Sequence, residues 1–138
     1  MKTNIIFAVL FMLVANISFA QTTPYNVVFD LAGKDTAEHK ALMRWISEIS
    51  GANPNAKLEV VLYAKGLDLV IKNKAMFGDE IEKILANKNI SFRVCAIAMK
   101  NQNVNKSELL PGIDIVPDGI YEIISKQSEG WGYIKVAL

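Results

Sequence analysis

The sequence predicts a three-layer α/β/α sandwich around a five-stranded, mainly parallel sheet. Five short apolar segments alternate along the chain with segments whose apolar residues recur at helical spacing. Parallel neighbours in a sheet need a crossover connection that covers one face, so this alternation predicts helices on both faces. The predicted strands span residues 25–30, 57–63, 91–98, 113–116 and 133–136.

The first helix has boundary signals at both ends. A polar turn around Gly33 follows the first strand, and Asp35 with Glu38 three residues later has the spacing of a capping box. Gly51 is a typical residue at the end of a helix. Between these signals the apolar residues fall on one helical face: Ala37, Ala41, Leu42, Trp45, Ile46 and Ile49.

The middle of the chain contains one strand, one undecided segment and one helix. Strand 57–63 includes the continuous run Val60-Val61-Leu62, which is typical of a strand covered on both faces. Residues 66–74 fit a short strand and a helical turn equally well, so no element is predicted there. Acidic residues in the first turn of the helix predicted at 78–88 interact favourably with its positive end.

The C-terminal part repeats the alternation. A short helix over 105–110 ends at Pro111-Gly112 and leads into the fourth strand. Pro117-Asp118 opens a helix that runs to Gln127, before the fifth strand.

The first twenty residues have the features of a cleavable signal peptide. Lys2 supplies a positive start, residues 5–14 are an apolar run short for a membrane span, and Ser18-Phe19-Ala20 offers small residues before a cut at Gln21. The alternative is an uncleaved N-terminal anchor. We expect cleavage after Ala20, a single α/β domain over residues 21–138, and a periplasmic or secreted location.

Charge and composition exclude several classes of function. Without Lys2 the chain has fourteen basic and fourteen acidic residues. It also has no basic stripe with interleaved aromatic residues, so we expect neither nucleic-acid binding nor, after signal cleavage, a membrane partner. One cysteine and one histidine are too few for a thioredoxin-like pair or a zinc site, and we expect no metal and no cofactor. We expect the histidine, His39, on the solvent face of the first helix.

A phosphate-binding loop is also excluded. Gly33-Lys34 follows a strand, but such a loop needs a glycine five residues earlier and a Ser or Thr after the lysine. The chain has Val28 and Asp35 at those positions.

The remaining candidate for chemistry is the single cysteine, Cys95. In parallel sheets the working groups lie beyond the carboxyl ends of the strands, and Cys95 lies where the third strand runs into a loop. Arg93 precedes it by two residues and so shares its face of the strand. Segments of the same edge provide a candidate binding cleft formed by Lys65, Gly66, Met99, Lys100, Pro117 and Gly119.

Two interpretations of Cys95 stay open. A free thiol with a pKa of about 8.5 becomes a useful nucleophile near neutral pH only where positive potential stabilises its anion. Lys65, Lys100 and the start of the helix near Asn105 are candidate sources of that potential. Free cysteine is also among the most buried residue types, and Cys95 could be plain strand interior.

The order and spacing of several motifs resemble those of the DsrE/DsrF-like family, in particular its branch of small, mostly uncharacterised proteins. These motifs are Ile90-Ser91-Phe92-Arg93-Val94-Cys95, Met99, Leu109-Leu110-Pro111-Gly112, Val116-Pro117-Asp118-Gly119 and Gln127-x-x-Gly130-Trp131-x-Tyr133-Ile134. The resemblance implies a parallel α/β sandwich that assembles as a homotrimer or homohexamer. In the sulfur-relay members it also implies a cysteine that carries persulfide sulfur between a donor and an acceptor protein, and Cys95 stands at the matching position. Those members are cytoplasmic, whereas this chain has a predicted export signal.

Two functions from different classes therefore remain open. The first is an exported persulfide carrier or thiol-reactive protein that acts through Cys95. The second is a non-catalytic oligomeric module that binds a small ligand or a partner in a cleft at the sheet edge. The sequence does not decide whether the protein is an enzyme.

Overall fold

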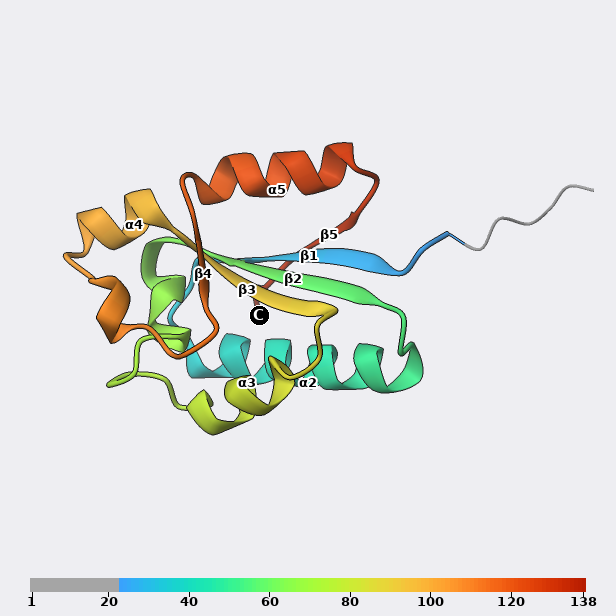
Figure 1. Cartoon of the computed structure of the whole chain (residues 1–138), viewed down its shortest axis with the longest axis horizontal. Helices are drawn as coiled ribbons and strands as arrows, with labels where there is room; N and C mark the ends of the chain where they lie inside the picture. The colour runs from blue at the N-terminus through green and yellow to red at the C-terminus, as the bar shows by residue number, and fades with distance from the viewer. Residues whose placement is uncertain (1–22) are drawn as a thin grey trace, which may run out of the picture.

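The computed structural model describes residues 23–138, drawn in colour in Figure 1. The predicted signal peptide and its cleavage site lie outside these residues. Within 23–138, no helix is long and apolar enough to cross a membrane. The elements in chain order are β1 (Asn26–Leu31), α2 (Thr36–Ala52), β2 (Lys57–Leu62), the 3₁₀ helix η1 (Ala64–Leu69), α3 (Gly78–Ile84), β3 (Ile90–Cys95), α4 (Ala96–Asn101), the 3₁₀ helix η2 (Lys106–Glu108), β4 (Asp114–Val116), α5 (Gly119–Ser128) and β5 (Gly132–Lys135).

The five strands form one parallel sheet in the order β4-β3-β2-β1-β5. Helices α2 and α3 cover one face and α5 covers the other, with α4 at the end where β3 terminates (Figure 1). The predicted three-layer α/β architecture is thus confirmed. The carboxyl ends of β2 and β3 meet at one edge, because Leu62 pairs with Val94.

The two faces of the sheet differ sharply in polarity. Alternate residues of each strand point to opposite faces, and the α2–α3 side receives an almost purely apolar set that forms the large core cluster. The α5 side receives Asp30, Glu59, Ser91 and Arg93 among its residues and has a small apolar cluster of its own. The prediction that β2 is covered on both faces is confirmed, since Val60 and Val61 are both fully buried.

The segment after the third strand differs from the prediction. We predicted a strand over 91–98, but β3 ends at Cys95 and α4 begins at the next residue. The edge strand β4 pairs with β3 only as far as Cys95–Val116, so no ladder supports a longer strand. Alanine favours a helix, and turning the chain here returns Ala98 and Met99 to the core.

Other helix boundaries also differ from the prediction. The undecided segment 66–74 contains the end of η1 and a single bridge from Ile71 to Leu109. The helix predicted over 105–110 is only η2, closed by a capping box in which Asn105 N–H donates to Glu108 Oε2 at 2.7 Å. The helix predicted to reach residue 88 ends at Ile84.

The start of α2 corrects the prediction for His39. Asp35 caps the helix by accepting from Ala37 N–H at 2.7 Å, while the Glu38 carboxylate lies against Gly33. His39 is buried, not solvated, because the turn after β1 folds onto the first turn of α2. Its Nε2 lies 3.1 Å from the carbonyl oxygen of Gly33, so the ring ties this turn to the helix.

Candidate functional site

A cleft of about 490 Å³ opens at the carboxyl ends of β2 and β3, and Cys95 lies in its wall. We call it the Cys95 cleft. The end of β2 and η1 form one side, α4 forms the second and the start of α5 forms the third. Its lining residues are Tyr63, Ala64, Lys65, Cys95, Ile97, Ala98, Asn101, Gln102, Asp118 and Ile120.

Cys95 is the last residue of β3 and the N-cap residue of α4. It is a free thiol with 5% of its surface exposed, so it borders the cleft but is almost fully buried. The first residue of α5, Gly119, lies directly on it. A Cβ atom at position 119 would stand 3.0 Å from Cys95 Cβ and 3.2 Å from Val61 Cγ1. A larger residue here would have to push Cys95 or Val61 aside, so glycine lets α5 begin this close to the sheet.

The charges in the cleft are balanced. Lys65 supplies an ammonium group and Asp118 a carboxylate. Asp118 caps α5, because its Oδ1 accepts from Ile120 N–H at 2.9 Å and from Tyr121 N–H at 3.3 Å. The carboxylate thereby offsets the partial positive charge at the start of α5. The cleft does not concentrate positive potential beyond what Lys65 and the first turn of α4 provide.

The residues predicted to form the cleft divide into two groups. Lys65 lines it and Gly119 packs against Cys95, as described above. Lys100 and Pro117 are exposed at the same edge but do not line the cleft. Lys100 therefore lies outside the cleft wall, whereas the sequence suggested it as a cationic neighbour of the thiol.

The two other predicted residues, Met99 and Gly66, are buried beneath the wall of the cleft. Met99 is buried in the core cluster. Gly66 is also buried, and a Cβ atom there would stand 2.2 Å from the carbonyl oxygen of Leu31. Gly66 therefore permits η1 to pass close to the end of β1, which places Lys65 at the cleft.

Several lining residues were not predicted. Ile97 and Asn101 lie one helical turn apart on the same side of α4, and both line the cleft. They were missed because the chain after Cys95 was predicted as a strand. Gln102 joins α4 to η1, since its Nε2 donates to the carbonyl oxygen of Ala64. A helical assignment of the Ala-Ile-Ala-Met run would have identified Ile97 and Asn101 in advance.

A pair of phenols surrounds a buried carboxylate beside the cleft. Asp30 on β1 is 5% exposed, and Tyr133 Oη donates to its Oδ2 at 2.6 Å. This hydrogen bond is the main reason that the pKa of Tyr133 rises to about 12. Burial, together with the Asp30 carboxylate, raises the pKa of Tyr63 to about 12 as well. At neutral pH the Tyr63 hydroxyl is therefore protonated, with its hydrogen bond directed to Asp30.

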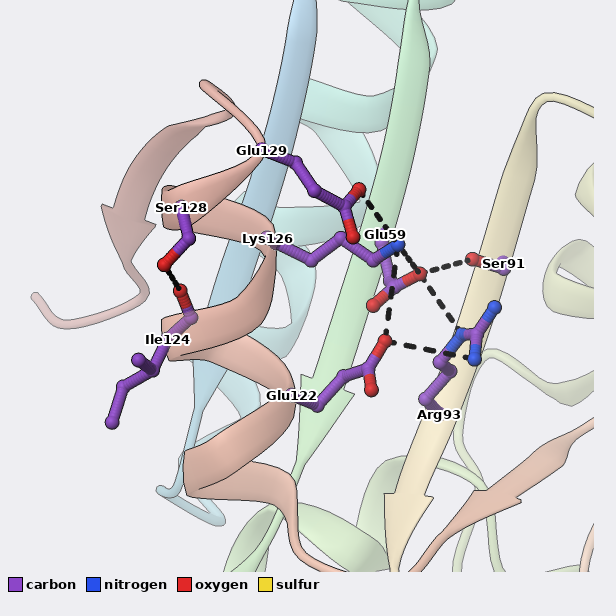
Figure 2. Close-up of polar contacts among 8 residues, drawn as sticks. All are labelled: Glu59, Ser91, Arg93, Glu122, Ile124, Lys126, Ser128 and Glu129. Carbon is purple, nitrogen blue, oxygen red and sulfur yellow. Dashed lines mark hydrogen bonds and ion pairs between the residues drawn. The ribbon is translucent and has the colours of Figure 1, made fainter.

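A second polar group lies on the same face of the sheet, beneath α5 (Figure 2). We call it the Glu59 cluster; its members are Glu59, Ser91, Arg93, Glu122, Lys126 and Glu129. Glu59 Oε2 lies 2.9 Å from Arg93 Nε, 3.9 Å from Lys126 Nζ and 3.3 Å from the Ser91 hydroxyl. Arg93 shares the face of Cys95 as predicted, but its guanidinium group pairs with Glu59 and Glu122.

Burial controls the titration of this cluster. Glu59 is 2% exposed, and loss of hydration raises its pKa to about 7 although Arg93 and Lys126 act in the opposite direction. Lys126 also lies over the Trp131 ring, 4.9 Å from its centroid. Within residues 23–138, no group of three or more His, Cys, Asp or Glu side chains is placed to hold a metal ion.

Comparison with known proteins extends over nearly all of the described chain. The model of the DsrE/DsrF-like family matches residues 26–136. None of the curated proteins matches. A protein of unknown function from Methanobacterium thermoautotrophicum, MTH1491, superposes with a TM-score of 0.76 at 23% identity, over 80% of this chain and 98% of that one.

Two further solved structures share the fold. A conserved protein of unknown function from Bacteroides thetaiotaomicron, BT1422, has a TM-score of 0.69 at 16% identity and covers 85% of this chain and 99% of its own. The ychN protein of E. coli has a TM-score of 0.63 at 12% identity and covers 81% and 98%. At these identities the likeness concerns the fold.

Proposed function

This chain belongs to the DsrE/DsrF-like family, which is linked to sulfur relay, and from that premise we propose that it carries sulfur as a persulfide on Cys95 outside the cytoplasm, after cleavage following Ala20. The supporting observation is the position of the only cysteine of the chain. It lies at the carboxyl end of a parallel strand, in the wall of a cleft. Ligand sites of open α/β sheets occupy this edge.

The proposed step is an exchange between a thiolate and a persulfide. The Cys95 thiolate attacks the terminal sulfur of a donor persulfide, R–S–SH. A sulfur–sulfur bond forms on Cys95 while that of the donor breaks, and the donor leaves as the thiolate R–S⁻. The products are the persulfide of Cys95 and the donor thiolate, so electrons and atoms balance without an external oxidant.

The lining of the cleft suits this chemistry. The Lys65 ammonium group can balance the negative charge of a thiolate or persulfide anion. Ile97 and Ile120 provide an apolar rim that shields a bound sulfur atom from water.

Loading with inorganic polysulfide tests the proposal. We expect wild-type protein to gain one sulfur atom by intact mass, the gain to be reversed by a reductant, and Cys95→Ser to gain none. Lys65→Gln should load more slowly while keeping the fold, because only the charge beside the sulfur is lost. A native thiol that stays unmodified with polysulfide and with iodoacetamide, but reacts after unfolding, would refute the carrier role. Mass analysis of protein from its own compartment provides the matching observation in the cell.

A binding module that uses no thiol chemistry is the second candidate. It is favoured by the burial of Cys95 and by a set of exposed apolar side chains around the cleft, namely Ile97, Ile120, Tyr121 and Ile124. These side chains would suit a protein partner or further copies of this chain in a homotrimer or homohexamer. In this case Cys95→Ser keeps assembly and binding, while Ile120→Lys reduces the mass measured by light scattering. A monomeric wild-type protein would contradict the assembly.

A further inference from the structure

Helix α5 is attached to the sheet by few apolar contacts. Its own buried residues are only Gly119 and Ile123. The buried apolar cluster on this face consists of Ile123 with Val28 and Val61, whereas the opposite face carries the large core. The free energy needed to open an element rises with the apolar surface that opening exposes. Of the two long helices, α5 is therefore the one the sheet can release more easily.

Partly buried Tyr63 and Trp131 pack against this apolar cluster, and the polar part of the attachment is the Glu59 cluster (Figure 2). Glu122, Lys126 and Glu129 come from α5, while Glu59 comes from β2 and Arg93 from β3. When Glu59 is ionised, three carboxylates face two cations and the cluster has one negative charge in excess. When Glu59 holds a proton, the charges balance.

The other charged residues around Glu59 add one net positive charge, so the case for opening depends on the burial of Glu59 and not on the excess alone. On the β1 side its neighbour in register is the apolar Val28. A pocket of about 630 Å³ borders the cluster, and its other charged residues, Lys57, Lys88 and Asp114, come from β2, the segment before β3 and β4. Glu59 Oε1 is buried and has no hydrogen-bond partner among the described residues. Ionised Glu59 would gain hydration if α5 moved away from it.

The N-terminal end of α5 contacts Cys95. Gly119 packs on Cys95, while Asp118 and Ile120 line the Cys95 cleft. Glu122 lies three residues after Gly119 on the same helix and pairs with Arg93, with 3.6 Å between Oε1 and Nη1. A displacement of the first turn of α5 that separates Glu122 from Arg93 would also move Gly119 away from Cys95.

We propose that α5 opens away from Cys95 when Glu59 loses its proton, so that access to the thiol increases with pH across the neutral range. As regulation of the persulfide site the idea rests on the proposed function, but the opening itself does not require that Cys95 carries sulfur. Glu59 is then a positioning residue that acts on Cys95 through Arg93 and α5. Since burial raises the pKa of Glu59 from 4.5 to about 7, the change develops between these values and is complete just above neutral pH.

Hydrogen exchange of the α5 amides tests the opening. Glu59→Gln keeps the size of the side chain and removes its charge, so the wild-type to variant ratio of exchange rates cancels the intrinsic pH dependence. We expect a ratio near one at about pH 4, a rise between about pH 4.5 and about pH 7, and a several-fold excess for the wild type above about pH 7.5, with an upper limit of about 300-fold set by the rise of the pKa from 4.5 to about 7. The rate of Cys95 alkylation, compared at each pH in the same pair, should show the same trend.

Two other variants sharpen the result. Asp114→Asn removes a carboxylate from the same pocket without touching the ion pairs, and should behave as wild type. Glu122 raises the pKa of Glu59, so Glu122→Gln should move the transition to lower pH. If Glu59→Gln does not fold, the shift of the transition in Glu122→Gln tests the proposal in its place.

Equal α5 exchange in wild type and Glu59→Gln at every pH would overturn the proposal. So would α5 amides that exchange with the same opening free energy as the amides of β1 and β2, because α5 would then open only when the whole protein unfolds. The two proposals can fail separately. If α5 responds but polysulfide does not load Cys95, only the carrier role is lost; if loading occurs while α5 does not respond, only the regulation is lost.

Discussion

Replacing Glu59 with glutamine should make the protein more stable at neutral pH and leave it nearly unchanged in acid. The pKa of Glu59 is about 7 in the folded protein, against 4.5 for a free glutamate side chain. Between these values the folded state keeps a proton that the unfolded chain has released. Ionisation therefore lowers the free energy of unfolding as pH rises from about 4.5 to about 7, and the loss is complete above the folded pKa.

The size of the effect follows from the shift. One pKa unit corresponds to about 1.4 kcal/mol, so a shift of roughly two and a half units corresponds to about 3 kcal/mol. Because Glu59 is 2% exposed, solvent screening removes little of this value. Glutamine mimics the protonated side chain, so the variant should not lose this amount.

Urea unfolding of wild type and Glu59→Gln across this pH range measures the difference directly. We expect the two free energies to converge in acid and to separate by about 3 kcal/mol in favour of the variant near pH 8. Glu129→Gln is the matched control: its carboxylate is half exposed and pairs only with Lys126, so its removal should change stability by less than about 1 kcal/mol. Parallel curves for wild type and Glu59→Gln would refute the reasoning that burial outweighs the two ion pairs.

Two further substitutions test the packing and the hydrogen bonds near the site. Gly119→Ala places a methyl group 3.0 Å from Cys95 Cβ and should lower the free energy of unfolding by about 1–3 kcal/mol. Gly51→Ala is the control, because the space around Gly51 is open and the substitution should not lower the stability. Thermal melts compare the two variants, and equal melting temperatures would show that α5 shifts at no cost. Tyr133→Phe removes the hydrogen-bond donor to the buried Asp30 carboxylate. The free energy of unfolding, measured with urea at neutral pH, should fall by about 1–2 kcal/mol. An unchanged free energy would mean that water already hydrates this carboxylate.

Much of the candidate site could be placed from the sequence, and each exception has its own physical cause. The lone cysteine at a strand end, Lys65 in the next loop and Gly119 at a helix start all follow from local patterns of strands and turns. Lys100 was misplaced because the chain after Cys95 was predicted as strand, and a change from strand to helix redirects every following side chain. His39 was misplaced because its cover is a turn, which hydrophobic periodicity does not describe.

The sequence by itself determined the alternation of strands and helices, the coverage of β2 on both faces and the place of Cys95 at a strand end. These features depend on residues within a few positions of one another, which is the range over which backbone geometry sets periodicity. Only the tertiary structure decided that Glu59, Arg93 and Glu122 meet beneath α5, and that Gly119 nearly buries the thiol. Such contacts join segments tens of residues apart, and they arise from the pairing order of the strands and from helix packing, which no local pattern encodes.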